Sequence, residues 1–288
     1  MTGAVISPSH PASAGGPAAR RGGSTYSLMQ MNLCLSGLAG CYVKVAYPAA
    51  VAEAASLIRE WRPNAVTINE ACSGDAARIA RRTGYHMRFS TVIDGGKPFS
   101  CIRPGGRGLF GDAVLIAAPV VKTEGHAFSA QAGIEQRRWL CVATHDNVRV
   151  CTAHLATRDA IEVAGNQGQC GELAAILKRR RQARAVIFGG DVNRLSSCAP
   201  AGFWTRTDAT AEQDHGLQQV YGSSGLRSPS VQVVPLTHSD HDVLLVGVHL
   251  ARRRRSSRLQ WPGEVRCVST QLERLACQVS QELASPVW

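Results

Sequence analysis

The sequence contains no long apolar run, no Cys-x-x-Cys pair and few lysines. No segment approaches the roughly 18 consecutive apolar residues of a membrane-spanning helix, so the sequence predicts no such helix. The absence of a Cys-x-x-Cys pair and of a Cys/His cluster argues against a structural zinc site. Residues 1–25 also lack the apolar core of about 7–15 residues that marks a secretory signal peptide.

The composition is that of a folded protein with a basic surface. Hydrophobic residues make up 44% of the 288 residues and charged residues 18%, which excludes a mainly disordered or collagen-like chain. Lys and Arg number 32 against 21 Asp and Glu, a net charge of +11, and only four of the 32 are Lys. Because Arg binds phosphate in bidentate geometry, this excess favours a phosphate-bearing partner. A solvated basic surface explains it equally well.

Ten cysteines are present, and their even number favours an oxidising compartment. Cys34 and Cys41 bracket a short glycine-containing loop, so we expect them to form a disulfide. Cys170 and Cys198 are a second candidate pair. We therefore expect a secreted protein, with the cytoplasm as the alternative because no signal peptide is recognisable.

Changes in amino-acid composition along the chain predict a leader, a folded domain and a tail. Residues 1–25, rich in Ala, Gly, Ser and Pro, read as a flexible leader, and residues 26–251 as the folded domain. Residues 252–288 form a basic tail that opens with four consecutive arginines and holds seven Arg against three Glu. We expect the tail to be an appendage outside the core.

Strand-like and helix-like runs alternate within the domain, which predicts an α/β fold. We expect strands at 27–33, 65–68, 85–92, 113–117, 139–144, 148–154, 185–188 and 243–248, and helices at 51–61, 75–82 and 161–181. Asp75 is the expected N-cap of the second helix and Gly84 its C-terminal stop. Asp146-Asn147 predicts a hairpin turn between two strands, and hence mixed rather than purely parallel sheets.

Seven polar residues lie at or just beyond the ends of these strands, where sheet proteins present catalytic groups. They are Asn32, Glu70, His154, Asp191, Asn193, Asp240 and His241. Carboxylates with Asn suit a hard cation such as Mg²⁺ or Mn²⁺. Combined with two histidines, they suit hydrolysis of a phosphoester, whose anionic transition state must be neutralised.

The motifs around these residues resemble the endonuclease/exonuclease/phosphatase superfamily. In order, they are Met31-Asn32-Leu33, Asn69-Glu70, Gly111-Asp112-Ala113-Val114-Leu115, Thr152-Ala153-His154-Leu155, Gly190-Asp191-Val192-Asn193 and Ser239-Asp240-His241. The resemblance covers roughly residues 27–250 and is greatest to actinobacterial members. This deoxyribonuclease I-like group also includes apurinic endonucleases, neutral sphingomyelinases and inositol-polyphosphate phosphatases. The resemblance implies a four-layer α/β sandwich with two packed mixed β-sheets flanked by helices.

The resemblance also implies a metal-dependent hydrolysis by a directly attacking water. Glu70 would be the principal ligand of Mg²⁺ or Mn²⁺, helped by Asn32 and by Asp240. Asp191 would orient or deprotonate the water.

The remaining roles concern the phosphate and the leaving group. Asn193 would hold the phosphate or the Asp191 side chain, and Arg107 is a second expected phosphate contact. His241 would contact the scissile phosphate oxygen, with Asp240 beside it in the catalytic set. His154 would stabilise charge or protonate the leaving group.

Three positions depart from the family pattern. Asn69 replaces a common Gln, and Asp112 replaces an Asn near the site. Gln218 stands where the family has an Asp that pairs with the final His, although Asp208 or Asp214 could substitute. With Gln218 beside it, His241 is expected to titrate near its ordinary pKa of about 6.5.

Net charge and the arginine runs favour a nuclease that acts on a phosphodiester substrate such as DNA. The alternatives are a phosphatase or sphingomyelinase-like phospholipase, and a basic nucleic-acid-binding module that has lost catalysis. We expect a monomer.

Overall fold

The computed structural model describes residues 24–158, 163–181 and 185–251. The predicted tail at 252–288 lies outside these ranges, as does almost all of the predicted leader. No helix within the described ranges has both the length and the apolar character needed to cross a membrane.

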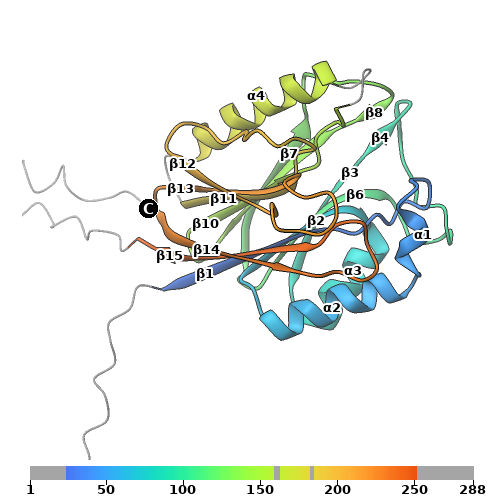
Figure 1. Ribbon diagram of the computed structural model, residues 1–288, viewed down its shortest axis with the longest axis horizontal. Coiled ribbons are helices and arrows are strands. Elements are labelled where there is room, and N and C mark those ends of the chain that lie inside the picture. Colours follow the sequence, from blue (N-terminus) through green and yellow to red (C-terminus); the bar gives the residue numbers. More distant parts are fainter. Residues whose placement is uncertain (1–23, 159–162, 182–184, 252–288) are drawn as a thin grey trace, which may run out of the picture. The chain divides into compact units, whose positions relative to one another are not determined.

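The first sheet has six strands in the order β14–β15–β1–β2–β6–β3 (Figure 1). Their bounds are β1 Thr25–Asn32, β2 Ala65–Cys72, β3 His86–Thr91, β6 Phe110–Ile116, β14 Leu226–Val234 and β15 Val243–Leu250. Strands β1 and β2 run parallel and the other neighbours antiparallel, so the sheet is mixed.

The second sheet has the order β12–β13–β11–β10–β9–β7. Its strands are β7 Val120–Ala127, β9 Arg138–Thr144, β10 Val148–Ala153, β11 Ala185–Asp191, β12 Phe203–Thr207 and β13 Gln218–Ser223. It too contains one parallel pair, β10 with β11. A small third sheet joins β4 (Ile93–Asp94) to β5 (Lys97–Pro98) and β8 (Glu135–Gln136).

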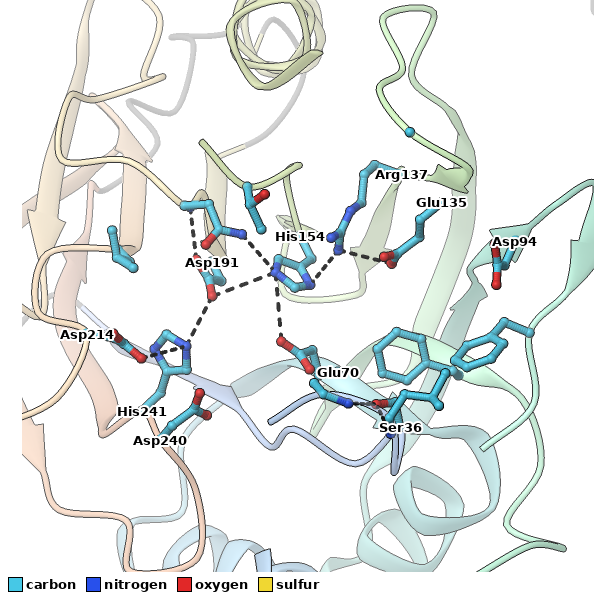
Figure 2. A pocket seen from close by; sticks show the side chains of 18 of the residues that line it. Ser36, Glu70, Asp94, Glu135, Arg137, His154, Asp191, Asp214, Asp240 and His241 are labelled. Atoms are coloured by element: carbon cyan, nitrogen blue, oxygen red, sulfur yellow. Dashed lines mark hydrogen bonds and ion pairs between the residues drawn. The ribbon is translucent and has the colours of Figure 1, made fainter. Parts of the chain in front are cut away.

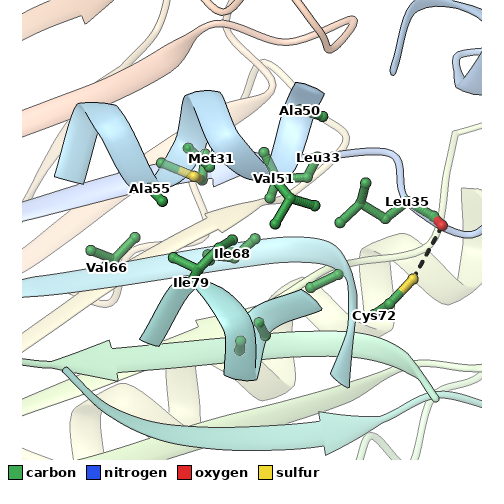
Figure 3. Close-up of a cluster of buried hydrophobic side chains, with 14 of the residues drawn as sticks. Met31, Leu33, Leu35, Ala50, Val51, Ala55, Val66, Ile68, Cys72 and Ile79 are labelled. Carbon is green, nitrogen blue, oxygen red and sulfur yellow. Dashed lines mark hydrogen bonds between the residues drawn. The ribbon is translucent and has the colours of Figure 1, made fainter. Parts of the chain in front are cut away.

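Two helical layers flank the packed pair of large sheets. The sheets bury a shared core that includes Leu28, Val150 and Ile187. Helices α2 (Ala49–Trp61) and α3 (Ser73–Thr83) cover the first sheet, where Val51 and Ile79 pack with the strand residues drawn in Figure 3. Helix α4 (Val163–Arg180) covers the second sheet, and the short α1 spans Tyr42–Val45. The predicted four-layer sandwich is therefore confirmed.

The predicted helix ends are partly confirmed. Gly84 terminates α3 with a φ of +78°, a left-handed conformation that glycine adopts at low cost. Asp75 is not the N-cap of α3, because the helix begins at Ser73. Asp75 is instead buried, and its Oδ2 lies 3.0 Å from the Arg107 guanidinium. The pairing of a buried carboxylate with a distant arginine is not visible in local sequence.

Several strands were not expected from the sequence, among them β7, β12 and β14. All three are edge strands of the large sheets. An edge strand contacts only one neighbour and keeps polar side chains in solvent, so its sequence lacks the apolar run of a central strand. Strand β7 illustrates this, since Lys122 and Thr123 in its middle are exposed and Glu124 is only partly buried.

Disulfides join eight of the described cysteines as Cys34–Cys41, Cys72–Cys101, Cys141–Cys151 and Cys170–Cys198. The first and last of these confirm the two predicted pairs. Cys141 and Cys151 occupy directly opposed positions of β9 and β10. Cys170–Cys198 fastens α4 to the loop that follows β11. Four disulfides are consistent with an extracellular protein.

Candidate active site

The carboxyl ends of the two parallel strand pairs meet at one edge of the sandwich. Asn32 ends β1, and Glu70 lies near the end of β2. In the other sheet, His154 follows β10 and Asp191 ends β11. Because β1 packs on β11 and β2 on β10, the side chains converge on one pocket (Figure 2).

Glu70 occupies an irregular point of β2. The pairing of β2 with β6 shifts register between Ile68 and Ala71, and Glu70 has a φ of +54°. Such a conformation costs a non-glycine residue about 1–3 kcal/mol and persists only where the surroundings enforce it. The bulge re-aims the side chain. Its carboxylate lines the pocket, where Oε1 accepts a hydrogen bond from Asn32 Nδ2 at 3.0 Å.

Negative charge predominates around Glu70. Burial raises its pKa to about 7, and the neighbouring carboxylates of Asp191 and Asp240 add to the rise. The hydrogen bond from Asn32 and the charge of Arg137 act in the opposite direction. An ionised Glu70 is therefore poorly neutralised by the protein alone, a deficit that a bound cation would relieve.

Asp191 lies at the centre of the cluster and is fully buried. Its Oδ2 accepts a hydrogen bond from Asn32 Nδ2 at 3.1 Å and lies 3.4 Å from His241 Nε2. Burial opposes ionisation of Asp191, but the imidazoles of His154 and His241 and the hydrogen bonds outweigh it and lower the pKa below its ordinary value. Asp191 is thus an anion at neutral pH and can accept a proton.

His241 is surrounded by carboxylates. Burial alone would lower its pKa, but Asp191, Asp240 and Asp214 outweigh burial and raise it. The expectation of an ordinary pKa is therefore wrong, and the ring is more readily cationic. Its Nδ1 is buried without a hydrogen-bond partner among the described residues.

His154 is held in one tautomer by Arg137. The Arg137 guanidinium lies 2.9 Å from His154 Nδ1, and since an arginine can only donate, Nδ1 must be the unprotonated nitrogen. Nε2 then bears the proton and lies 3.8 Å from Asp191 Oδ2. Asn193 Nδ2, 3.0 Å from Nε2, is also a donor, so in this tautomer the two nitrogens form no hydrogen bond, and Nδ2 donates instead to the Leu155 carbonyl at 2.9 Å. Burial and the charge of Arg137 lower the pKa of His154 to about 3. The ring is neutral at physiological pH, which favours charge stabilisation over protonation of a leaving group.

Arg137 is the site residue that sequence reasoning missed. It precedes β9, its side chain is 7% exposed, and it pairs with Glu135 at 3.2 Å as well as with His154. The only sequence signal is its place at the start of an apolar strand. Arg138 has almost the same local context, so sequence alone could not separate the two.

Asn69 links the two large sheets behind the site. Its Oδ1 accepts the backbone N–H of Asp191 at 2.8 Å, and its Nδ2 donates to Asp112 Oδ1 at 2.8 Å. Burial raises the pKa of Asp112 to about 7. Asp112 does not line the pocket. Through its hydrogen bond with Asn69, it supports that residue from behind the pocket.

Gln218 does not take the place of the carboxylate expected beside His241. Its side-chain amide donates to Asp208 Oδ2 at 3.2 Å and to the carbonyl of Asp242 at 2.5 Å. Among the described residues, the carboxylates within 4.0 Å of the His241 ring are those of Asp191 and Asp214. Of the two suggested substitutes, Asp214 is therefore the one in contact.

Arg107 does not lie in the pocket, which overturns its expected phosphate contact. The side chain is 4% exposed, and its guanidinium donates to Asp75 Oδ2 at 3.0 Å and to the carbonyl of Leu35 at 2.7 Å. It also stacks 4.7 Å from the centre of the Tyr47 ring. These contacts join α3 to two loops, a structural role.

The pocket is a cavity of about 770 Å³ lined by catalytic candidates and by apolar residues. Glu70, His154, Asp191, Asn193, Asp240 and His241 all line it. Of the expected metal ligands, Glu70 and Asp240 reach the cavity, and Asn32 is fully buried beside Glu70. The carboxylate oxygens of Glu70 and Asp240 fit a hard cation, as does the charge deficit around Glu70. Asn32 instead turns its Nδ2 to Glu70, and its Oδ1 accepts the Cys34 N–H at 3.1 Å. Ligand atoms of Asp214, Asp240 and His241 also lie within 4.8 Å of one another.

Comparison with known proteins identifies the chain's relatives. The family model described as Endonuclease/Exonuclease/phosphatase family matches residues 35–241. The chain belongs to this family. A search of curated proteins finds no match.

Solved structures share the family's fold at low sequence identity. The catalytic domain of human Nocturnin with a bound sulfate anion is 16% identical, with a TM-score of 0.60 over 78% of this chain and 93% of that one. The endonuclease/exonuclease/phosphatase from Beutenbergia cavernae is 16% identical, with a TM-score of 0.58 over 79% and 72%. TDP2 from Caenorhabditis elegans is 15% identical, with a TM-score of 0.56 over 78% and 74%. At these identities the likeness establishes the fold alone.

Proposed function

We propose that this protein is a divalent-metal-dependent phosphoesterase that hydrolyses phosphodiester bonds by direct attack of water. Membership of the family supports hydrolysis of a phosphoester. The observation that best supports the proposal is Asp191, an ionised carboxylate at the floor of the pocket with His241 Nε2 3.4 Å away.

Each side chain has a distinct task in this reaction. Asp191 accepts a proton as the water oxygen forms its bond to phosphorus and the bond to the leaving alcohol breaks. His241, with its raised pKa, donates an N–H to a non-bridging phosphate oxygen. Neutral His154, oriented by Arg137, offers its Nε2–H to developing negative charge. Asp191 then releases the proton it accepted to solvent, and the departing alkoxide takes one from solvent, so that the products are an alcohol and a phosphomonoester and Asp191 is again an anion.

Glu70 and Asp240 would hold the metal ion, Mg²⁺ or Mn²⁺, while Asn32 positions the Glu70 carboxylate through its Nδ2. When bound, the ion would neutralise charge that develops on the phosphate. Asn193 supports the same arrangement, since its backbone N–H donates to Asp191 Oδ1 at 2.9 Å and its amide contacts His154.

The substrate expected from net charge is a nucleic acid, and the basic tail supports that expectation. The pocket lining favours the second candidate, a compact phosphoester, because Arg137 is the only Lys or Arg among the described lining residues. We further propose a monomer that works outside the reducing cytosol, as four disulfides would require.

Substitution of the principal ligand tests the proposal. Glu70→Gln should lower kcat for bis-p-nitrophenyl phosphate by more than tenfold at saturating Mg²⁺, a loss above about 1.4 kcal/mol, without lowering the melting temperature. Exposed Glu60→Gln on α2 is the matched control. Plasmid DNA and a lipid phosphodiester, each with Mg²⁺, Mn²⁺ or EDTA, are assayed in parallel. Activity that persists in EDTA or in Glu70→Gln would refute the metal-dependent mechanism.

A further inference from the structure

One side of the pocket is apolar. Leu38, Ala39, Phe99, Phe110 and Ile134 line it, and we call these five residues the apolar rim. Phe99 and Phe110 pack edge to face at 5.6 Å. Leu38 is 59% exposed and Ile134 76% exposed, so both present hydrophobic surface to solvent at the pocket.

Leu38 is displayed by a rigid loop. The Cys34–Cys41 disulfide closes the segment that holds it. Within the loop, Ser36 Oγ accepts the backbone N–H of Leu38 at 3.1 Å, and the Ser36 carbonyl accepts the N–H of Ile102 at 3.0 Å. A side chain fixed in this way is held outward by the fold and is not free to collapse into the core.

Ile134 is held on the other segment by the small third sheet. It directly precedes β8, whose Glu135 pairs with Asp94 of β4. Its carbonyl accepts the N–H of Gly95 at 3.2 Å. Two independently braced loops therefore offer aliphatic side chains to the same cavity, which indicates an apolar ligand group.

The charges of the lining limit what that ligand can be. Six carboxylates line the cavity, from Glu70, Asp94, Glu135, Asp191, Asp214 and Asp240, against the guanidinium of Arg137 and the imidazole of His241. A cation on Glu70 and Asp240 would still leave Asp94 and Asp214 in the lining, the latter 3.9 Å from His241 Nε2. A polyanion would place further phosphates against these carboxylates, whereas an uncharged substituent would not.

We propose that the pocket takes a phosphodiester in which one alcohol is an uncharged, apolar group, and that Leu38 and Ile134 bind this group. This inference rests on the phosphoesterase function proposed above and names its substrate class. The phosphoryl group would lie on the floor formed by Asp191 and its neighbours. The apolar group would lie along the apolar rim.

Binding of alkylphosphonates to the full chain in Mg²⁺ tests the inference without catalysis. Calorimetric affinity should rise from methyl- to butyl- to octylphosphonate, by up to about fourfold for each buried methylene. Benzylphosphonate is included because the larger gain, octyl or benzyl, identifies the apolar group as aliphatic or aromatic. Equal affinities across the series would overturn the proposal.

Exposed side chains of the rim can be replaced with little risk to folding. Leu38→Ser and Ile134→Ser should each weaken octylphosphonate binding by about fivefold and leave methylphosphonate binding unchanged. Leu195→Ser is the matched control, because Leu195 is 70% exposed and does not line the pocket. Equal losses in the control and the rim variants would contradict the assignment.

Competition and turnover complete the design. A single-stranded oligonucleotide should compete poorly with octylphosphonate at physiological salt, and stronger competition by the oligonucleotide would overturn the proposal.

Steady-state turnover gives a second measurement. Both rim variants should raise KM for hexyl p-nitrophenyl phosphate more than KM for methyl p-nitrophenyl phosphate, with kcat unchanged. Metal-independent turnover would refute the proposed function, whereas the phosphonate series decides the inference by itself.

Discussion

Asp191 is the residue on which the hydrogen bonds of the site converge. Asn32 reaches it from the first sheet, and the backbone N–H of Asn193 from the loop that follows β11. Its interactions with His154 and His241 keep a fully buried carboxylate ionised. A base and an adjacent imidazole held this close are expected to act in one transition state.

The proximity of Asp191 and His241 gives a prediction about coupled catalytic roles. Asp191→Asn removes the base and keeps its shape, and His241→Ala removes the donor, so each should lower kcat by at least about 100-fold. The double variant should lose much less than the product of the two single losses. Steady-state kinetics on a small phosphodiester measure all three. Fully multiplicative losses would mean that the two residues act in separate steps.

Asp112 gives a prediction about pH and stability. Its pKa is raised from 3.8 to about 7 by burial, so the folded protein binds this proton more tightly than the unfolded chain does. The stabilisation is complete below pH 3.8 and is lost as the pH rises through about 7. In EDTA, the wild type should therefore lose on the order of 1–4 kcal/mol more unfolding free energy than Asp112→Asn between pH 4 and 7, since one pKa unit corresponds to about 1.4 kcal/mol.

Urea unfolding at several pH values checks the Asp112 prediction. Glu60→Gln, which removes one exposed carboxylate from α2, should follow the wild-type pH dependence. If Asp112→Asn also follows it, then Asp112 is ionised in the folded protein at these pH values.

At the scale of elements, the loop between β1 and α1 depends on its disulfide. We expect mass spectrometry of the unreduced protein to find no free thiol at Cys34 or Cys41. Replacement of both by Ser should lower the unfolding free energy by about 2–3 kcal/mol, because the unfolded chain loses a short closed loop. The same double variant should weaken octylphosphonate binding more than methylphosphonate binding. Free thiols at both positions would remove a main argument for an oxidising compartment.

At the scale of the whole molecule, we predict that the fold does not require the tail at 252–288. Strand β15 ends at Leu250 and is hydrogen-bonded on both sides, to β1 and to β14. Deletion of residues 252–288 should therefore preserve turnover of a small phosphodiester. DNA binding should weaken and depend less steeply on salt, because seven arginines no longer displace counterions. A chain that unfolds on deletion would place the tail within the core.

The sequence by itself determined the identity of the central strands and most of the polar residues at their ends. Apolar runs such as 185–188 are buried on both faces, so their burial is written in local composition. The motifs of Asp191 and His241 could be found for the same reason, since Asp191 follows such a run and His241 precedes the run at 243–248. Edge strands such as β7 could not be found in this way, because their solvent-exposed side chains are polar and interrupt the apolar run that marks a central strand.

Only the tertiary structure decided how the site residues are partnered. Nothing in the local sequence distinguishes the roles of Arg107 and Arg137. In the structure, Arg107 is buried against Asp75, whereas Arg137 orients His154. Gln218 turns to Asp208 and away from His241 because strands β12 and β13 are neighbours, which sequence spacing does not reveal. Contacts between residues distant in the chain depend on how the two sheets pack, and that packing sets the charges, tautomers and apolar rim of the pocket.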